Sequence, residues 1–252
     1  MKKQDLNMRN WFTAGGENYA RYRPVYPDKL ASYLASIAPD RNCALDVGCG
    51  TGQLTRQLAR YFAFVKGVDP SANQLSNAEV VPGVSYECSP AESLPLQPSG
   101  YSLITAAQAA HWFKLSDFYS EVRRVAAPDA VIALISYGVL QLDDALNERF
   151  RHFYYDQIFS YWPAERQLVD NGYNSIDFPF NELASPRITI ELDWDFEAFA
   201  GYISTWSAVV RALEAGEEKM LREFCEDMAE LWGDISVTRT VTWPLNMRAG
   251  RI

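Results

Sequence analysis

The stretch LDVGCGTGQ, residues 45–53, decides the fold. It completes a short apolar run, residues 43–47, that is typical of a buried strand, and it leads into residues 52–62, whose apolar residues fall on one helical face. Glycines between a strand and a helix let the backbone turn sharply and approach a ligand with no Cβ in the way. We therefore predict a strand, glycine loop and helix that begin a ligand-binding α/β domain.

The spacing within this loop indicates which kind of ligand it binds. Gly48, Gly50 and Gly52 are spaced G-x-G-x-G, and Gln53 stands where a dinucleotide fold usually needs a later small residue. Asp46 lies two residues before the first glycine. Its negative charge would oppose a pyrophosphate but suits a cationic ligand such as a sulfonium or an α-amino group. The loop therefore disfavours a nicotinamide-dependent oxidoreductase.

A second acid ends the next predicted strand. Asp69 follows the apolar residues 64–68, and a carboxylate at that place can accept hydrogen bonds from both ribose hydroxyls of an adenosine. Alone, Asp69 could equally be the N-cap of the helix expected at 72–78. The glycine loop before it favours the nucleoside-binding interpretation.

The first 140 residues alternate between strand and helix patterns. We predict strands at 43–47, 64–68, 84–88, 101–106 and 130–137, and helices at 27–37, 52–62, 72–78 and 115–125. Such alternation predicts parallel βαβ units.

The second half of the chain has a different pattern. We predict helices at 143–162, 196–213 and 217–232, and strands at 187–194 and 237–243. The two late strands can form an antiparallel hairpin at the edge of an otherwise parallel sheet, where Arg239 would be tolerated.

Composition narrows the classes of partner and compartment. The 252 residues carry a net charge of −9 and no basic run longer than a pair, which disfavours a nucleic-acid substrate. No signal peptide or membrane-spanning run is evident, and the four cysteines are scattered, so we expect a cytoplasmic protein without a metal site. A monomer and a homodimer remain equally open.

Several further motifs give the chain a family resemblance. With the glycine loop and Asp69, these are residues 19–27, 69–75, 90–95 and 108–113. The chain resembles the class I S-adenosylmethionine-dependent methyltransferases with a type 11 domain. It looks closest to the small-molecule branch that includes the trans-aconitate and cantharidin methyltransferases.

The resemblance implies a fold and a domain organisation. The fold class is α/β: a Rossmann-like, doubly wound, mostly parallel seven-stranded sheet in the order 3-2-1-4-5-7-6, with an antiparallel edge strand and a helical insertion in the C-terminal half. A single domain, 1–252, is expected to comprise an N-terminal lid (1–27), a cofactor-binding half (28–140) and substrate-side elements (141–252).

The resemblance also implies a cofactor and its contacts. The cofactor is S-adenosyl-L-methionine, the product is S-adenosyl-L-homocysteine, and no metal takes part. The residues expected to contact the cofactor are Tyr19, Arg23, Asp46, Gly48, Gly50, Gly52, Asp69, Pro70, Gln74, Ala91, Glu92 and Gln108. Two simpler alternatives stay open: residues 19–26 as an aromatic strap over the core, and Glu92 as a solvated loop acid.

The acceptor side is defined less closely by sequence. His111 is the candidate general base and a substrate contact, and Trp112, Tyr137 and Trp206 are expected to line a pocket for a small, partly apolar acid or phenol. His111 and Trp112 could instead be buried structural residues. We predict methyl transfer to a small molecule, with O-methylation of a carboxylic acid foremost. The alternatives are a cofactor-binding protein without turnover, and a methyltransferase acting on a protein or other nucleophile.

Overall fold

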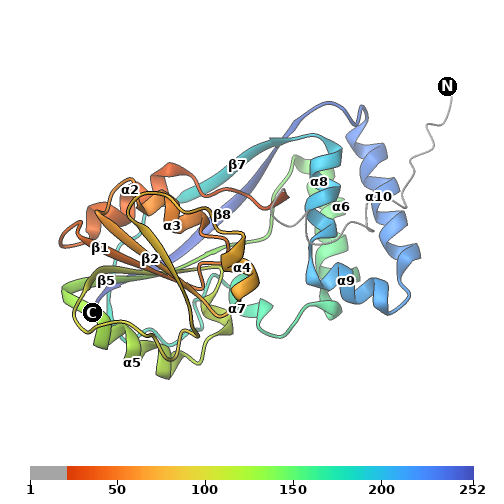
Figure 1. The fold of residues 1–252 in the computed structure, drawn as a ribbon. Coiled ribbons are helices and arrows are strands. Elements are labelled where there is room, and N and C mark those ends of the chain that lie inside the picture. Colours follow the sequence, from red (N-terminus) through yellow and green to blue (C-terminus); the bar gives the residue numbers. More distant parts are fainter. Residues whose placement is uncertain (1–21) are drawn as a thin grey trace. The chain divides into compact units, whose positions relative to one another are not determined.

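A computed structural model describes residues 22–252 of the chain. Seven strands form a sheet in the order β3-β2-β1-β4-β5-β8-β6, and an eighth, β7, pairs with β8 (Figure 1). The strands are β1 (Cys43–Val47), β2 (Phe64–Asp69), β3 (Val84–Cys88), β4 (Tyr101–Ala107), β5 (Ala126–Tyr137), β6 (Asn181–Leu183), β7 (Ile188–Trp194) and β8 (Arg239–Arg251). Strands β1 to β5 pair in parallel and β8 runs antiparallel to β5, so the expected order and the antiparallel last strand are confirmed.

Helices cover both faces of the parallel strands (Figure 1). They are α2 (Asp28–Ile37), α3 (Gln53–Leu58), α4 (Ala72–Ser76), α5 (Leu115–Val125) and α7 (Arg166–Asp170), with a short 3-10 turn, η2 (Ala110–Trp112). Phe118 and Val122 of α5 and Val169 of α7 share one buried cluster with Leu45 and Ile132 from the sheet. Strands β1 and β4 are buried along most of their length because both of their faces are covered, and most of their residues are apolar.

Strand β8 differs most from its predicted bounds. It continues to Arg251, beyond the predicted end at 243, and pairs with β5 and β6 as well as with β7. The polar residues of this extension hid it from sequence patterns. Arg248 is accommodated because it donates to Glu182 and to the carbonyls of Tyr173 and Ile176.

Two long helices predicted in the second half are each divided. The 143–162 segment consists of α6 (Asp144–His152), a π turn, η3 (Phe153–Gln157), and a 3-10 turn, η4 (Phe159–Tyr161). The 196–213 segment consists of α8 (Phe196–Ser204) and α9 (Ser207–Glu214), separated because Trp206 adopts extended backbone angles. The third, α10 (Glu218–Trp232), agrees closely with its prediction.

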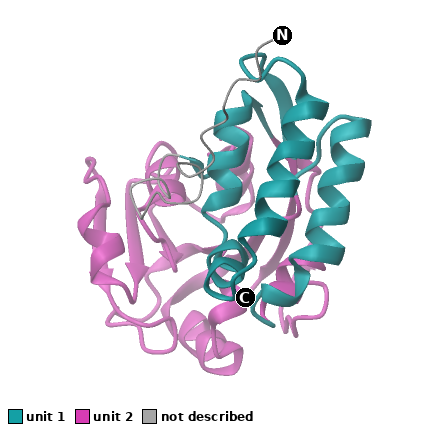
Figure 2. Ribbon diagram, turned by 90° about the vertical axis from the view of Figure 1, so that its right-hand side faces the viewer, with its two compact units in different colours: residues 1–24, 140–164, 191–242 teal, residues 25–139, 165–190, 243–252 magenta. Residues whose placement is uncertain are grey.

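The chain forms two compact units, each built from separated segments (Figure 2). Unit 1 comprises residues 1–24, 140–164 and 191–242, and unit 2 comprises residues 25–139, 165–190 and 243–252. Unit 1 is mainly helical, and its core includes Phe153 stacked on Phe224 with ring centroids 3.7 Å apart. Among the described residues, no helix is long and apolar enough to cross a membrane.

Candidate functional site

The glycine loop lies at the carboxyl end of β1, where the sheet order reverses between β2 and β4 on its two sides. The backbone N–H groups of Gly48 and Cys49 both donate to the carbonyl of Val68, at 2.7 and 3.0 Å, so β2 anchors the loop. Gly48 has a φ of 70°, and a Cβ there would collide with the Cβ of Ala109. Open α/β sheets bind ligands outside the carboxyl ends of their strands at such a switch point.

Gly50 presents the open side of this loop. Its φ is 54°, and a Cβ built on it would meet no heavy atom within 4 Å. Gly52, at a φ of 76°, is the N-cap of α3 and leaves no room for a Cβ beside Tyr86. Space is therefore open beside the half-buried main chain of Gly50, where a ligand can approach closely, whereas Gly48 and Gly52 are tightly packed.

Asp69 connects β2 to the glycine loop. One carboxylate oxygen accepts the N–H of Gly50 at 2.8 Å, and the other accepts the N–H of Ser71 at 2.9 Å. The N-cap of α4 is Ser71, whose hydroxyl accepts from Gln74, so the N-cap alternative for Asp69 is wrong. Each carboxylate oxygen keeps a further lone pair that can accept a hydroxyl, as a ribose diol requires.

Asp46 is buried beneath the same loop. Its two carboxylate oxygens accept the hydroxyls of Thr55 and Thr105, at 2.7 and 2.8 Å. Burial raises the pKa of Asp46 to about 6, because loss of water penalises the charged form more than the two threonine hydrogen bonds favour it. Asp46 thus places a charge behind the loop, and its role toward a cofactor stays a prediction.

The loop that follows β3 lies beside Asp69. Its first residue, Ser89, donates its N–H to the Asp69 carbonyl at 3.2 Å. Ala91 is buried, and a Glu92 carboxylate oxygen accepts the N–H of Lys114 at 2.8 Å, at the N-terminus of α5. Glu92 is half-buried and bonded to the fold through one carboxylate oxygen, and its contact with a cofactor, like those of Ala91, Pro70 and Gln74, remains a prediction.

Strained backbone marks the carboxyl end of β4. Gln108 has a φ of 54°, and its N–H donates to the Ile135 carbonyl at 2.8 Å. Non-glycine residues in this region cost free energy and cluster at functional sites. The η2 turn that follows carries His111 and Trp112, so the predicted cofactor-floor residue and the predicted base come from adjoining segments.

His111 is held by a residue that the sequence did not single out. Its Nδ1 lies 2.9 Å from the hydroxyl oxygen of Tyr173, a fully buried side chain with a φ of 63°. Burial is the main cause that lowers the pKa of His111 to about 4. The positive charge of Arg166 also lowers this pKa, and the negative charge of Glu165 raises it. His111 is consequently neutral at pH 7, as a general base or hydrogen-bonding imidazole must be.

The other residues predicted to contact the methyl-accepting substrate have different environments. Trp112 is 61% exposed, which rules out the interpretation of it as a buried core residue, and its ring centroid lies 4.8 Å from that of His111. Tyr137 is buried near Tyr26 in unit 2. Trp206 is buried among aromatic rings of unit 1. The contacts of these residues with a substrate stay predictions.

The N-terminal residues add little structural evidence. Tyr19 lies outside the described residues, and Arg23 is half-buried within unit 1. Their predicted contacts with the methionine end of a cofactor are untested. Nor do the described residues bring together three His, Cys, Asp or Glu side chains that could hold a metal ion.

The residues present fit a nucleoside cofactor. The open main chain at Gly50, the acceptor capacity left on Asp69 and the buried charge of Asp46 lie together at the switch point of the sheet. This combination, on a Rossmann-like sheet, is compatible with an adenosine-containing ligand that bears positive charge.

Comparisons with known proteins identify the family. The profile of the Methyltransferase domain matches residues 45–134. A Dictyostelium discoideum protein named as a methyltransferase is 34% identical over 225 residues, which span 88% of this chain and 86% of the relative. The solved structure named for a type II methyltransferase of Anaeromyxobacter dehalogenans has a TM-score of 0.87 and 40% identity, over 91% of this chain and 98% of that one.

A more distant relative is named for its cofactor. It is a Saccharomyces cerevisiae protein named as an S-adenosylmethionine-dependent methyltransferase, 28% identical over 147 residues that span 54% of this chain and 50% of the relative. The chain belongs to the methyltransferase-domain family and is an S-adenosylmethionine-dependent methyltransferase of class I.

Proposed function

We propose that this enzyme transfers a methyl group to a small molecule, foremost to the oxygen of a carboxylic acid, as in the trans-aconitate and cantharidin branch that its motifs resemble. The observation that carries the proposal is the setting of His111, a neutral imidazole whose Nδ1 lies 2.9 Å from the Tyr173 hydroxyl oxygen and whose ring lies beside that of the exposed Trp112. When Nδ1 accepts the tyrosine hydroxyl, Nε2 carries the proton and can donate to a carboxylate oxygen.

The cofactor would be held by the glycine loop and by Asp69. When bound, S-adenosylmethionine supplies an electrophilic methyl group on a sulfonium. The open space beside Gly50 leaves room for close approach, and Asp69 offers acceptors for ribose hydroxyls while it holds the loop. Pro70, Gln74, Ala91, Glu92 and Gln108 complete the proposed cofactor contacts, with Tyr19 and Arg23 expected at the methionine end.

A carboxylate acceptor makes small demands on acid–base chemistry. It is ionised at pH 7 and needs no proton removed, so His111 orients it rather than deprotonates it. The exposed face of Trp112 supplies an apolar wall, with Tyr137 and Trp206 as the other proposed substrate contacts. Alignment of reacting groups can contribute on the order of 7–11 kcal/mol in favourable cases, which makes orientation the main task of these side chains.

The test is a transfer assay with methyl-labelled S-adenosylmethionine on matched small acids, phenols and amines. We expect label in the acids, in a form that mild base releases as volatile methanol, because methyl esters hydrolyse and methyl ethers and amines do not. Label that stays with a phenol or an amine after base would overturn the carboxylate assignment. Binding of S-adenosylhomocysteine without any transfer across the panel would overturn the small-molecule proposal.

A further inference from the structure

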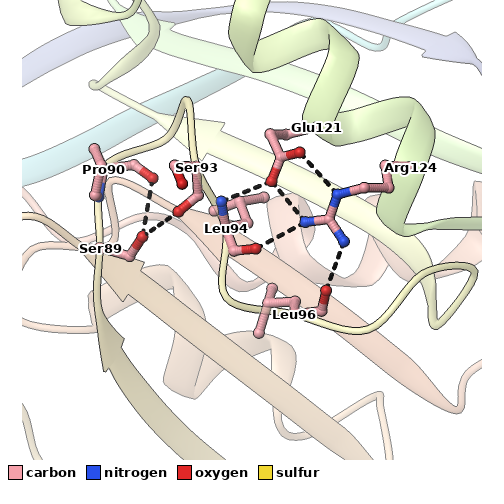
Figure 3. A network of polar contacts seen from close by, with 7 residues as sticks. All are labelled: Ser89, Pro90, Ser93, Leu94, Leu96, Glu121 and Arg124. Atoms are coloured by element: carbon pink, nitrogen blue, oxygen red, sulfur yellow. Dashed lines mark hydrogen bonds and ion pairs between the residues drawn. The ribbon is translucent and has the colours of Figure 1, made fainter.

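The loop after β3 is bonded to helix α5 by two residues of that helix, Glu121 and Arg124, which also form an ion pair with each other (Figure 3). The Arg124 guanidinium donates to both carboxylate oxygens of Glu121, through Nε at 2.8 Å and through Nη2 at 2.6 Å. Glu121 is mostly buried, and the adjacent guanidinium holds the pKa of its carboxyl below the ordinary value. A bidentate pair of this kind has a defined geometry, unlike a single exposed contact.

The same two side chains also bond the loop backbone. Arg124 donates to the carbonyls of Leu94 and Leu96, at 2.7 and 2.6 Å, and Glu121 accepts the N–H of Leu94 at 2.7 Å. Both backbone polar groups of Leu94 are therefore bound by one ion pair (Figure 3). The side chain of Leu94 is buried in the core.

The loop is fixed at its other end as well. The Ser89 hydroxyl donates to the carbonyls of Ser93 and Pro90, which closes the loop on itself (Figure 3). The backbone N–H of Ser89 donates to the main-chain carbonyl of Asp69, the residue whose carboxylate is proposed for the ribose. Residues 89–96 thus run from the nucleoside acid to the α5 ion pair with their backbone bonded at both ends.

We propose that Glu121 and Arg124 are positioning residues of the nucleoside pocket. They act through Leu94 to hold Ala91 and Glu92 in place beside Asp69, so that the cofactor meets a loop already ordered for it. This inference rests on the proposed contacts of Ala91 and Glu92 with the adenine. A preorganised loop improves affinity because less conformational entropy is lost on binding.

The test compares three full-length variants. Arg124→Met removes every donor while keeping the aliphatic stem, and Arg124→Lys keeps the charge but cannot span two carbonyls and a carboxylate. Asp117→Asn is the matched control, because it breaks another i,i+3 ion pair on α5, with the Lys114 side chain, and leaves in place the main-chain N–H of Lys114 that holds Glu92. Calorimetry measures the Kd of S-adenosylhomocysteine and of 5′-methylthioadenosine, which lacks the amino-acid part.

We expect Arg124→Met to raise both Kd values by about three- to tenfold, the loss expected when one or two hydrogen bonds no longer order the site. Arg124→Lys should be intermediate and Asp117→Asn unchanged. Hydrogen exchange at the Leu94 amide should quicken in Arg124→Met and not in Asp117→Asn. In turnover, the KM for the cofactor should rise while kcat at saturating cofactor stays the same, a split that general destabilisation would not produce.

Two outcomes would overturn the proposal. One is faster exchange at Leu94 in either Arg124 variant with both Kd values unchanged. The other is a weaker Kd for S-adenosylhomocysteine only, which would place the effect away from the nucleoside. If Arg124→Met fails to fold, the comparison of Arg124→Lys with Asp117→Asn decides the question. Wild-type protein that binds neither ligand would instead contradict the cofactor assignment.

Discussion

Asp69 both holds the glycine loop and offers acceptors to a ribose. In Asp69→Asn one carboxylate oxygen becomes an NH₂ group, which faces either the Gly50 or the Ser71 N–H that Asp69 now accepts. We expect the Kd of S-adenosylhomocysteine to rise at least about tenfold, since a hydrogen bond to a charged group is worth about 1.5–3 kcal/mol. Calorimetric titration measures this. An unchanged Kd would remove Asp69 from the cofactor site.

A substitution at Asp46 can separate the effect of its charge on cofactor affinity from the effect of its hydrogen bonds. Asp46→Asn is nearly isosteric, and the hydroxyls of Thr55 and Thr105 can rotate to suit an amide. We expect the affinity for S-adenosylmethionine, which carries a sulfonium, to fall more than that for S-adenosylhomocysteine, which does not. Parallel titrations of both ligands decide this, and equal losses would show that the buried charge does not act on the sulfonium.

The raised pKa of Asp46, about 6, adds a pH dependence with a definite sign. As pH falls through 6 the carboxyl becomes neutral, so wild-type affinity for S-adenosylmethionine should weaken there and that of Asp46→Asn should not. Between the ordinary pKa and 6 the folded state binds more protons than the unfolded state, so ionisation of Asp46 lowers stability as pH rises. Chemical denaturation at pH 7.5 should accordingly find Asp46→Asn as stable as the wild type or more so.

Because His111 does not titrate near neutral pH, the pH dependence of kcat/KM can report whether the methyl acceptor must lose a proton. The pKa of His111, about 4, leaves this residue neutral throughout pH 6–8, where a carboxylate acceptor is also fully ionised. We expect kcat/KM for the acceptor, measured at saturating S-adenosylmethionine so that protonation of Asp46 does not enter, to be flat over this range, and His111→Gln to lower it without changing the shape of the profile. A rate that rises with pH would indicate an acceptor that must lose a proton, such as a phenol.

The same shift affects stability at acid pH. Because the folded-state pKa of His111 is lowered, the unfolded state binds more protons between about pH 4 and 6.5. The stability that neutral His111 contributes to the folded state is fully present above pH 6.5 and is lost as pH falls toward 4. His111→Gln should therefore flatten the acid limb of the wild-type denaturation curve.

The glycine loop is the element on which the fold and the site both depend. Gly48 has a φ of 70° and faces the Ala109 Cβ, so Gly48→Ala adds backbone strain and a steric collision. We expect a loss of about 1–3 kcal/mol, the range for a residue forced into a sparsely populated conformation, with S-adenosylhomocysteine binding abolished or strongly weakened. Denaturant titration measures the first effect and calorimetry the second. Thr51→Ala, in the same loop, is the control and should retain most of the stability.

Sequence patterns predicted elements well where local and tertiary signals agree. The strands at 43–47 and 84–88 and the helix at 115–125 have their predicted bounds. Sequence patterns fail where contacts with residues distant in sequence determine the structure. Strand β8 reaches Arg251 because Glu182 and two distant carbonyls accept from Arg248, and no neighbouring residue signals those partners.

The candidate site likewise has one part that local sequence spacing predicts and another that depends on long-range contacts. Asp69 and the glycine loop lie within one strand–helix–strand unit, β1-α3-β2, so their spacing is informative. Tyr173 contacts His111 across 62 positions of sequence, and Arg124 binds carbonyls 28 and 30 positions away. The ion pair of Arg124 with Glu121 is visible as a helical i,i+3 pattern, but its hold on the loop backbone emerges only in the folded chain.

At the scale of the whole molecule, the two units are interleaved along the chain. Crossings fall at residues 24–25, 139–140, 164–165, 190–191 and 242–243, and both β7 and β8 contribute residues to each unit. Both strands run unbroken through a crossing, so each unit contains part of the same strand. We infer that the units unfold together rather than as separate domains.

A core variant in unit 1 tests this inference. Phe224 is fully buried, stacks on Phe153 and lies under the Arg149 guanidinium, whose central carbon is 5.1 Å from its ring centroid. Phe224→Ala should cost about 3–5 kcal/mol, the range for removing a buried phenylalanine. If unfolding is cooperative, the slowest-exchanging amides of β1 in unit 2 should lose as much protection as those of α10 in unit 1. Val237→Ala, an exposed change in unit 1, should alter neither, whereas a loss confined to α10 would show that the helical unit opens alone.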